Sequence, residues 1–101
     1  MEHSSTLNGT TLTVSIRGDY GFTDNAETQK IITEITDGDC TLCSIDLSGL
    51  QSIDSSGLGM FLLLNEAVKN AGKKIELSKP VGQVLKMLQI SKFADIITIK
   101  T

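Results

Sequence analysis

The chain has no tryptophan, and its 101 residues include only one proline, one histidine and one tyrosine. Because His3 is the only imidazole, a serine–histidine–acid hydrolase is excluded, and a histidine-rich metal site is excluded as well. Three phenylalanines and one tyrosine are too few to build the aromatic stacking platform typical of single-strand nucleic-acid binders. These absences argue against several classes of enzyme and of nucleic-acid-binding protein.

An excess of positive charge and long hydrophobic runs are missing too. The net charge is −3, and the basic residues are scattered, with Lys73 and Lys74 the only adjacent pair. A basic face for nucleic acid is therefore not expected. The longest apolar run, residues 58–64, is too short to span a bilayer, and the polar residues 1–6 do not resemble a signal peptide. We expect a soluble, cytoplasmic protein with no nucleic-acid or membrane partner.

Hydrophobic residues make up 40% of the chain, which is enough for one globular domain over residues 1–101. Cys40 and Cys43 have the spacing of a redox pair, but such pairs normally sit at a helix start and this one leads into a predicted strand. No further ligands for zinc and no phosphate-binding loop of the Gly-x-x-x-x-Gly-Lys type are present. No cofactor or metal is expected.

Apolar periodicity predicts an α/β protein with elements in the order β-β-α-β-α-β-α-β. The Asn8-Gly9 pair is a hairpin signal, Gly18 is expected to end the second strand, and Asp24 and Glu27 have the spacing of a helix-capping pair. Parallel strands joined by right-handed crossovers are expected to form a small mixed sheet packed with helices. The predicted strands cover residues 3–7, 12–16, 42–47, 74–78 and 96–99, and the helices cover about 24–36, 58–71 and 80–88.

The most informative segment is Asp54-Ser55-Ser56-Gly57-Leu58-Gly59, which lies between a strand and an apolar helix. A helix start offers unpaired backbone N–H groups and a partial positive charge, so it favours an anion such as phosphate. Residues 48–57 also lie at the carboxyl edge of the predicted parallel sheet, where functional loops gather. The same side chains could simply cap the helix, and the two interpretations are compatible.

The stretch Ile45-Asp46-Leu47-Ser48-Gly49-Leu50, followed by residues 53–59, resembles the signature of the STAS domain. More narrowly, it is similar to the stand-alone bacterial anti-sigma-factor antagonists, and the likeness covers residues 12–99. The resemblance implies a small mixed sheet packed with helices. It also implies that Ser56, the second serine of Asp-Ser-Ser-Gly, accepts a phosphate, with Asp54, Ser55 and Gly57 as the switch loop around it.

The resemblance further implies partner switching by a protein that is not an enzyme. The unmodified domain would bind a serine/threonine kinase or anti-sigma factor of the histidine-kinase-like ATPase fold, and phosphorylation would end the complex. A phosphatase of the PP2C type would restore it. The alternative is a STAS-like module that senses a ligand or nucleotide, or serves as a scaffold, and whose loop binds an anion without being modified.

One departure from the family pattern lies after the first long strand. Family members often carry Gly-Glu-x-Asp there, whereas this chain has Gly18-Asp19-Tyr20-Gly21. Asp19 can stand for the acidic residue, but a glycine replaces the final aspartate. We therefore expect Asp19 to contact the partner, while the details of kinase recognition differ from the family pattern.

The helix after the motif also provides expected partner contacts. Leu58 and Leu62 fall near its polar edge, outside the expected core stripe, and so could contact another protein. Gly57 and Gly59 would let another backbone come close. The expected core stripe consists of Phe61, Leu64, Val68 and Ala71, with Met60, Leu63 and Ala67 beside it.

Overall fold

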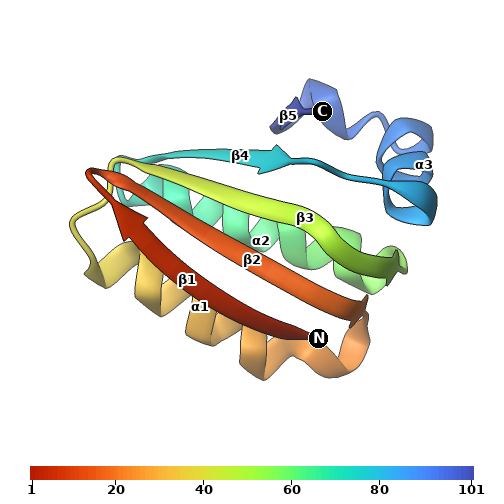
Figure 1. Cartoon of the computed structure of the whole chain (residues 1–101), viewed down its shortest axis with the longest axis horizontal. Helices are drawn as coiled ribbons and strands as arrows, with labels where there is room; N and C mark the ends of the chain where they lie inside the picture. Colours follow the sequence, from red (N-terminus) through yellow and green to blue (C-terminus); the bar gives the residue numbers. More distant parts are fainter.

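The computed structural model describes all 101 residues, as a five-stranded sheet with three α-helices. The strands lie in the order β1-β2-β3-β4-β5; β1 is antiparallel to β2 and the other neighbours are parallel (Figure 1). This confirms the predicted fold class and order of elements. The strands are β1 (Glu2–Asn8), β2 (Thr11–Tyr20), β3 (Leu42–Ile53), β4 (Lys74–Ser78) and β5 (Thr98–Lys100).

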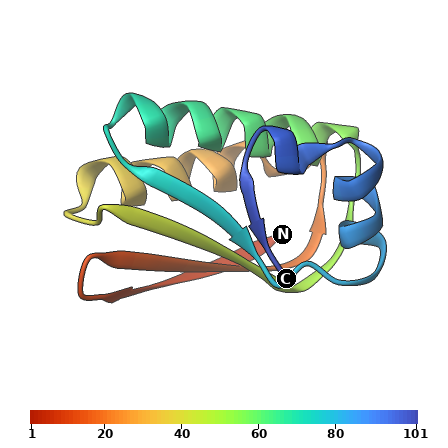
Figure 2. The same ribbon diagram turned by 90° about the horizontal axis from the view of Figure 1, so that it is seen from above.

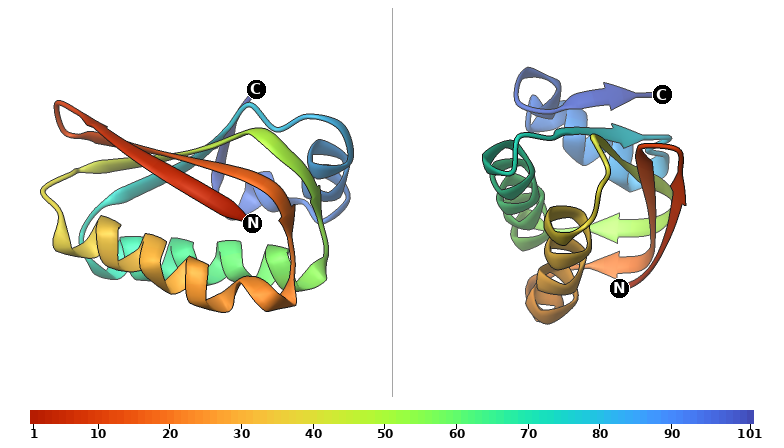
Figure 3. Two further views of the ribbon diagram at one scale, coloured as in Figure 1. Left: turned by 60° about the horizontal axis from the view of Figure 1, so that its bottom comes forward. Right: turned by 90° about the vertical axis from the view of Figure 1, so that its left-hand side faces the viewer.

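The helices α1 (Asn25–Asp37) and α2 (Ser55–Asn70) lie side by side on one face of the sheet (Figure 3). This follows from the topology, because successive right-handed crossovers between β2, β3 and β4 step across the sheet in one direction. The third helix, α3 (Gly82–Ile90), follows the carboxyl end of β4 and lies beside the last part of β3 (Figure 2). None of the helices has the length and apolar composition needed to cross a membrane.

The core lies between the sheet and the pair formed by α1 and α2. Phe61 of α2 is at its centre and contacts Tyr20 edge-on, with ring centroids 5.3 Å apart. Phe61 also contacts Phe93 of the short 3-10 turn η2 (Phe93–Asp95), with ring centroids 6.4 Å apart. Other fully buried side chains are Val14, Ile16, Ile31, Ile35, Ile45, Leu47, Leu50, Leu64, Leu77 and Leu88.

Two strands are longer than the sequence pattern predicts. β2 does not end at Gly18 but continues to Tyr20, because register shifts on either side of Gly18, whose φ is +90°, absorb the glycine within the strand. β3 continues past Leu47 to Ile53, and it is again paired with β2 at Gly49, Leu50, Ser52 and Ile53. The predicted loop at residues 48–57 is therefore mostly strand, and α2 begins at Ser55 rather than at Leu58.

The first helix is not capped as predicted. Asp24 occupies the N-cap of α1 but makes no side-chain cap hydrogen bond; its Oδ2 accepts from the Gly21 N–H at 2.8 Å instead. Glu27 is engaged by His3 of β1, whose Nδ1 lies 2.6 Å from Glu27 Oε2. The spacing of Asp24 and Glu27 suits a cap, but the Asp24 carboxylate is occupied by Gly21 and by the amino group of Met1, and the Glu27 carboxylate by His3.

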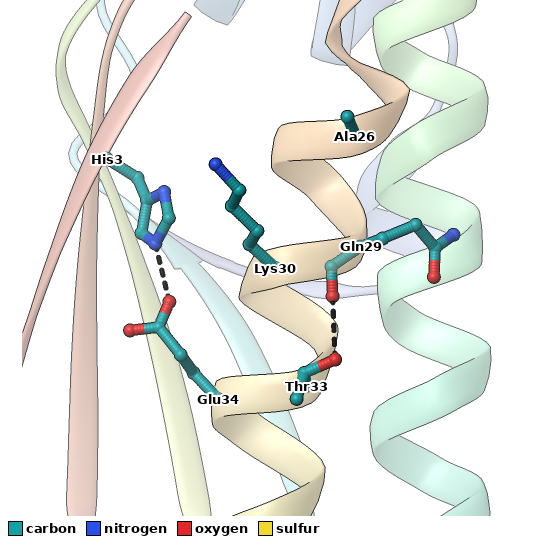
Figure 4. A pocket seen from close by; sticks show the side chains of 6 residues that line it. All are labelled: His3, Ala26, Gln29, Lys30, Thr33 and Glu34. Carbon is teal, nitrogen blue, oxygen red and sulfur yellow. Dashed lines mark hydrogen bonds and ion pairs between the residues drawn. The ribbon is translucent and has the colours of Figure 1, made fainter.

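His3 is the residue that ties β1 to α1. Its Nε2 lies 2.5 Å from Glu34 Oε2, about two helical turns further along α1 than Glu27 (Figure 4). The hydrogen bond with His3 is the main reason that the pKa of Glu27 is lowered. His3 therefore contacts two residues that are far from it in the sequence, and both contacts hold β1 against α1.

Lys73, in the turn before β4, closes the end of α1. Its Nζ donates to the carbonyl oxygens of Ile35 at 2.5 Å and Gly38 at 2.6 Å. These carbonyls have no partner within the helix, and a cation there also interacts favourably with the helix dipole.

We predict that Lys73→Met destabilises the domain by about 1–3 kcal/mol, because two carbonyl groups lose a charged donor. Lys74→Met is the matched control, since Lys74 is exposed and makes no side-chain hydrogen bond or ion pair. Urea unfolding followed by circular dichroism measures both variants. Equal unfolding midpoints for the two would contradict this role of Lys73.

Candidate functional site

The site is built where β2 and β3 end side by side. Tyr20, the last residue of β2, is paired with Ile53, the last residue of β3. Asp54 follows and is the N-cap of α2: its Oδ1 accepts from the Gly57 N–H at 2.9 Å, and its own N–H donates to the Tyr20 carbonyl at 3.2 Å. The capping role considered for Asp54 is therefore present, and it holds the start of α2 against the end of β2.

The next two residues are Ser55 and Ser56, the first two of α2. Ser55 is exposed and Ser56 is half-buried, and neither hydroxyl has a hydrogen-bond partner in the protein. Their backbone N–H groups have no carbonyl four residues earlier in the helix to bond. Two free hydroxyls thus stand at the positive end of a helix of 16 residues, where an anionic group is favoured.

The two serines face different directions. At about 100° per residue, Ser55 lies on the same helical face as Gly59 and Leu62, which are partly or fully open to solvent. Ser56 lies on the side that carries Leu63, which lines a groove between α2 and α1. Ser55 therefore begins the solvent-facing side of α2, whereas Ser56 lies on the side of α2 that carries Leu63.

Gly57 packs inside the protein and is not a place for a partner to approach. A Cβ atom at this position would lie 2.6 Å from Cγ1 of Ile53 and 2.6 Å from the Tyr20 carbonyl oxygen. Only hydrogen lets the first turn of α2 sit this close to the strand ends. The expectation that Gly57 admits another backbone is wrong, whereas Gly59, with nothing within 4 Å of its Cβ position, has open space beside it.

The glycine at position 21 is also required by close packing. A Cβ atom there would lie 2.9 Å from Oδ2 of Asp54, although the backbone conformation at φ −149° suits any residue. The Asp54 carboxylate thus occupies the space beside residue 21. The glycine that departs from the family's acidic pattern lies directly against the N-cap of α2.

Asp19 lies at the same edge of the sheet but does not contact the serines. Its Oδ1 accepts from the Ser52 hydroxyl at 2.6 Å, across the paired ends of β2 and β3. Asp19 is exposed, as a partner contact must be. It adds a second exposed carboxylate, besides Asp54, to the edge of the sheet that precedes α2.

Comparison with known proteins agrees with this geometry. A family model described as "Mlab, STAS domain" matches residues 3–98. The chain belongs to the STAS domain family.

Solved structures of similar fold include anti-sigma factor antagonists. Unphosphorylated SpoIIAA superposes with a TM-score of 0.79 at 22% identity, covering 99% of this chain and 89% of that one. The phosphorylated form of SpoIIAA, from Bacillus, gives 0.71 at 20% identity, with 99% and 92% covered. An antagonist from Mycobacterium paratuberculosis gives 0.84 at 12% identity, with 98% and 84% covered.

A curated relative is Sulfate transporter 3.1 of Arabidopsis thaliana, which is 37% identical over 49 residues. That match covers 48% of this chain but 7% of the transporter's length.

The sequence of this STAS domain predicts that Leu58 and Leu62, in the first two turns of α2, contact a partner, but only Leu62 is exposed. Leu58 is 8% exposed and belongs to the core, so its expected role as a partner contact is wrong. The buried arc of α2 is wide enough at its embedded N-terminal end to include Leu58 as well as Gly57 and Met60. Leu62 is 41% exposed, so its expected role as a partner contact stays a prediction.

The expected core stripe of α2 needs two further corrections. Leu63, placed beside the core, is 46% exposed at the groove with α1, and Ala71 is exposed beyond the helix end. The other expected core side chains Phe61, Leu64, Val68 and Met60 are buried. Leu62 and Leu63 therefore form an exposed apolar pair in the middle of α2.

Phe22 is a residue of the site that sequence reasoning missed. It follows Gly21 in the short 3-10 turn η1 (Phe22–Asp24), and its side chain is 76% exposed. It is the most exposed of the large hydrophobic side chains, and it directly follows the residue that packs against Asp54. The sequence did contain a signal for an exposed Phe22, because this residue lies outside any periodic apolar stripe and follows a glycine.

The cysteine pair does not form a second site. Cys43 lies in β3 and Cys40 precedes it, both buried and both as free thiols. Burial raises the pKa of the Cys43 thiol to about 12, with smaller contributions in the same direction from Cys40 and Glu76. Almost no thiolate is present at neutral pH, so Cys43 is unsuited to thiol–disulfide exchange.

We predict that Gly57→Ala destabilises the domain by about 1–3 kcal/mol, because the added methyl group must displace Ile53 or the end of β2. Gly59→Ala is the control on the same helix; with open space there, it gains about 0.5–1 kcal/mol of helix propensity. Thermal unfolding of both variants measures the difference. A Gly57→Ala protein as stable as Gly59→Ala would contradict the tight packing.

Proposed function

We propose that this STAS domain is a non-catalytic, cytoplasmic regulatory protein that acts by partner switching. In its unmodified form it binds a serine/threonine kinase or anti-sigma factor of the histidine-kinase-like ATPase fold. Phosphorylation at the start of α2 ends that complex, and a phosphatase of the PP2C type restores it. The main support is the pair of unbonded serine hydroxyls at the N-terminus of α2, at the carboxyl edge of the sheet.

The phosphate acceptor is one of these two serines. The resemblance of the motif assigned Ser56, but the exposure of the two residues favours Ser55, which is exposed, whereas Ser56 is half-buried. A kinase must bring its phosphate donor in line with the hydroxyl, which favours the exposed position. We therefore propose Ser55 as the main acceptor and keep Ser56 as the alternative.

The effect of the phosphate on the interface is electrostatic. It adds about −1.5 to −2 charges and three acceptor oxygens. The helix N-terminus tolerates this charge, so the fold should survive, but Asp54 already places a carboxylate beside it. An uncompensated charge buried in an interface costs about 3–5 kcal/mol, which corresponds to a loss of affinity of about 10²–10³-fold or more.

The surface offered to the partner is apolar around the serines. Phe22 lies in η1, and Leu62 follows Ser55 on the outward face of α2, with Gly59 between them where a backbone can come close. A mixture of exposed apolar side chains around a central small polar group is typical of a protein interface. The exposed carboxylates of Asp19 and Asp54 favour a partner with basic side chains at the rim.

For the switch we predict that Ser55→Asp keeps the fold and lowers partner affinity at least tenfold. Ser55→Ala keeps binding and is not phosphorylated. The measurements are a pull-down of the cognate kinase and the intact mass after incubation with kinase and ATP. Ser56→Ala is the matched control and should still gain about 80 Da per phosphate, the mass of the group that carries the charge.

The reverse pattern, with mass gained by Ser55→Ala and not by Ser56→Ala, would assign the phosphate to Ser56. The proposed function would be contradicted if neither the wild-type chain nor any variant gained mass while the same kinase phosphorylated a control substrate.

We also predict that Phe22→Ser weakens kinase binding by about 10–100-fold without unfolding the domain. Full burial of such a side chain at an interface contributes about 1.5–3 kcal/mol. Ile90→Ser is the control, because Ile90 is 66% exposed at the far end of α3. Titration calorimetry with the purified kinase measures both. Equal affinities for the two variants would remove Phe22 from the interface.

The alternative function is a module whose loop binds a small anion or nucleotide and is never modified. The unpaired N–H groups of Ser55 and Ser56 support it, because they suit any phosphate oxygen. Calorimetry with inorganic phosphate, ATP and GTP tests it. Saturable binding that Asp54→Asn alters, together with no mass gain on incubation with kinase, would favour this module over the switch.

A further inference from the structure

The last part of β3 has no neighbouring strand on one side. Its pairing with β4 stops at Asp46 and Ser78, while its pairing with β2 continues to Tyr20 and Ile53. In a parallel pair the N–H and C=O of one residue point to the same side, and those of the next residue to the other. Asp54 donates toward β2, so the two backbone groups of Ile53 point away from β2, where no strand follows.

The side chain of Gln83, in the first turn of α3, occupies that place. Its Oε1 accepts from the Ile53 N–H at 2.9 Å, and its Nε2 donates to the Ile53 carbonyl at 3.0 Å. One amide group thus reproduces both hydrogen bonds that a neighbouring strand would make. The chain is thus held by Gln83 at Ile53 and by Tyr20 of β2 at the next residue, Asp54.

We propose that Gln83 is a positioning residue for the switch, which couples the docking of α3 to the presentation of Ser55 and Ser56. The effect on the switch rests on the proposed function, whereas the hydrogen bonds between Gln83 and Ile53 do not. The helix itself is anchored by the buried side chains of Val84 and Leu88, whereas Gln83 is largely exposed and contributes little to the core. Its contribution is the pair of hydrogen bonds that fixes the end of β3.

The two hydrogen bonds with Ile53 require an amide side chain at position 83. Ile53 presents one donor and one acceptor, and the glutamine side chain presents the complementary pair. A carboxylate has only acceptors, so it would repel the Ile53 carbonyl oxygen. A protonated carboxylic acid has a donor and an acceptor again, so a glutamate at this position should hold the loop below its pKa and release it above.

The test compares Gln83→Met with Gln89→Met, a control on the same helix whose side chain is exposed and makes no hydrogen bond. Amide hydrogen exchange and nitrogen–proton NMR spectra follow residues 53–57. We expect Ile53 to exchange about tenfold faster or more in Gln83→Met, with shifted signals for Ser55 and Gly57. The Gln89→Met spectrum should match the wild type in this region.

The second part of the test uses pH and phosphate transfer. In Gln83→Glu, the signals of Ser55 and Gly57 should be native-like at acidic pH, and should move as the glutamate ionises. Gln83→Met should lower kcat/KM for phosphorylation by the kinase several-fold, while Gln83→Glu regains the rate as the pH is lowered toward its pKa, measured relative to wild type at each pH.

Equal exchange at Ile53 in the two methionine variants would overturn the proposal. So would faster exchange with an unchanged phosphorylation rate, because Gln83 would then stabilise the strand end without affecting the switch. A wild-type chain that accepts no phosphate would instead contradict the proposed function, and the exchange data would still decide whether Gln83 holds the loop.

Discussion

The arrangement of the site depends on one close contact, that of the first turn of α2 with the paired ends of β2 and β3. Gly57 leaves no room for a methyl group between itself and the Tyr20 carbonyl. Asp54 makes the turn possible by bonding Tyr20 through its backbone and Gly57 through its side chain. Because these contacts fix where the helix begins, they also decide which way the two following serines face.

This arrangement suits a switch that works by charge. The serines lie at a short strand-to-helix junction, so in the proposed switch a phosphate would alter an interface without remodelling the domain. The structural relatives of this STAS domain include one protein solved in both unphosphorylated and phosphorylated forms, with TM-scores of 0.79 and 0.71 to this chain. The fold therefore occurs in both states of that relative.

Much of the fold could be predicted from local patterns. Alternation in residues 12–16 and helical spacing in α1 and α2 are properties of neighbouring residues, and they correctly indicated the order of elements. Strand lengths could not be predicted in the same way. β2 passes through Gly18, and β3 passes through Ser48 and Gly49, because the two strands are paired with each other, and that pairing joins segments about thirty residues apart.

The sequence by itself determined the family, the order of strands and helices, and the position of the switch motif at a helix start with Asp54 as its cap. These depend on residues close together in the chain. Only the tertiary structure decided that Leu58 is buried, that Ser55 faces outward more than Ser56, that Phe22 is exposed beside the site, and that Gln83 holds Ile53. Exposure and such pairings depend on which distant segments cover a residue, and local spacing does not contain that information.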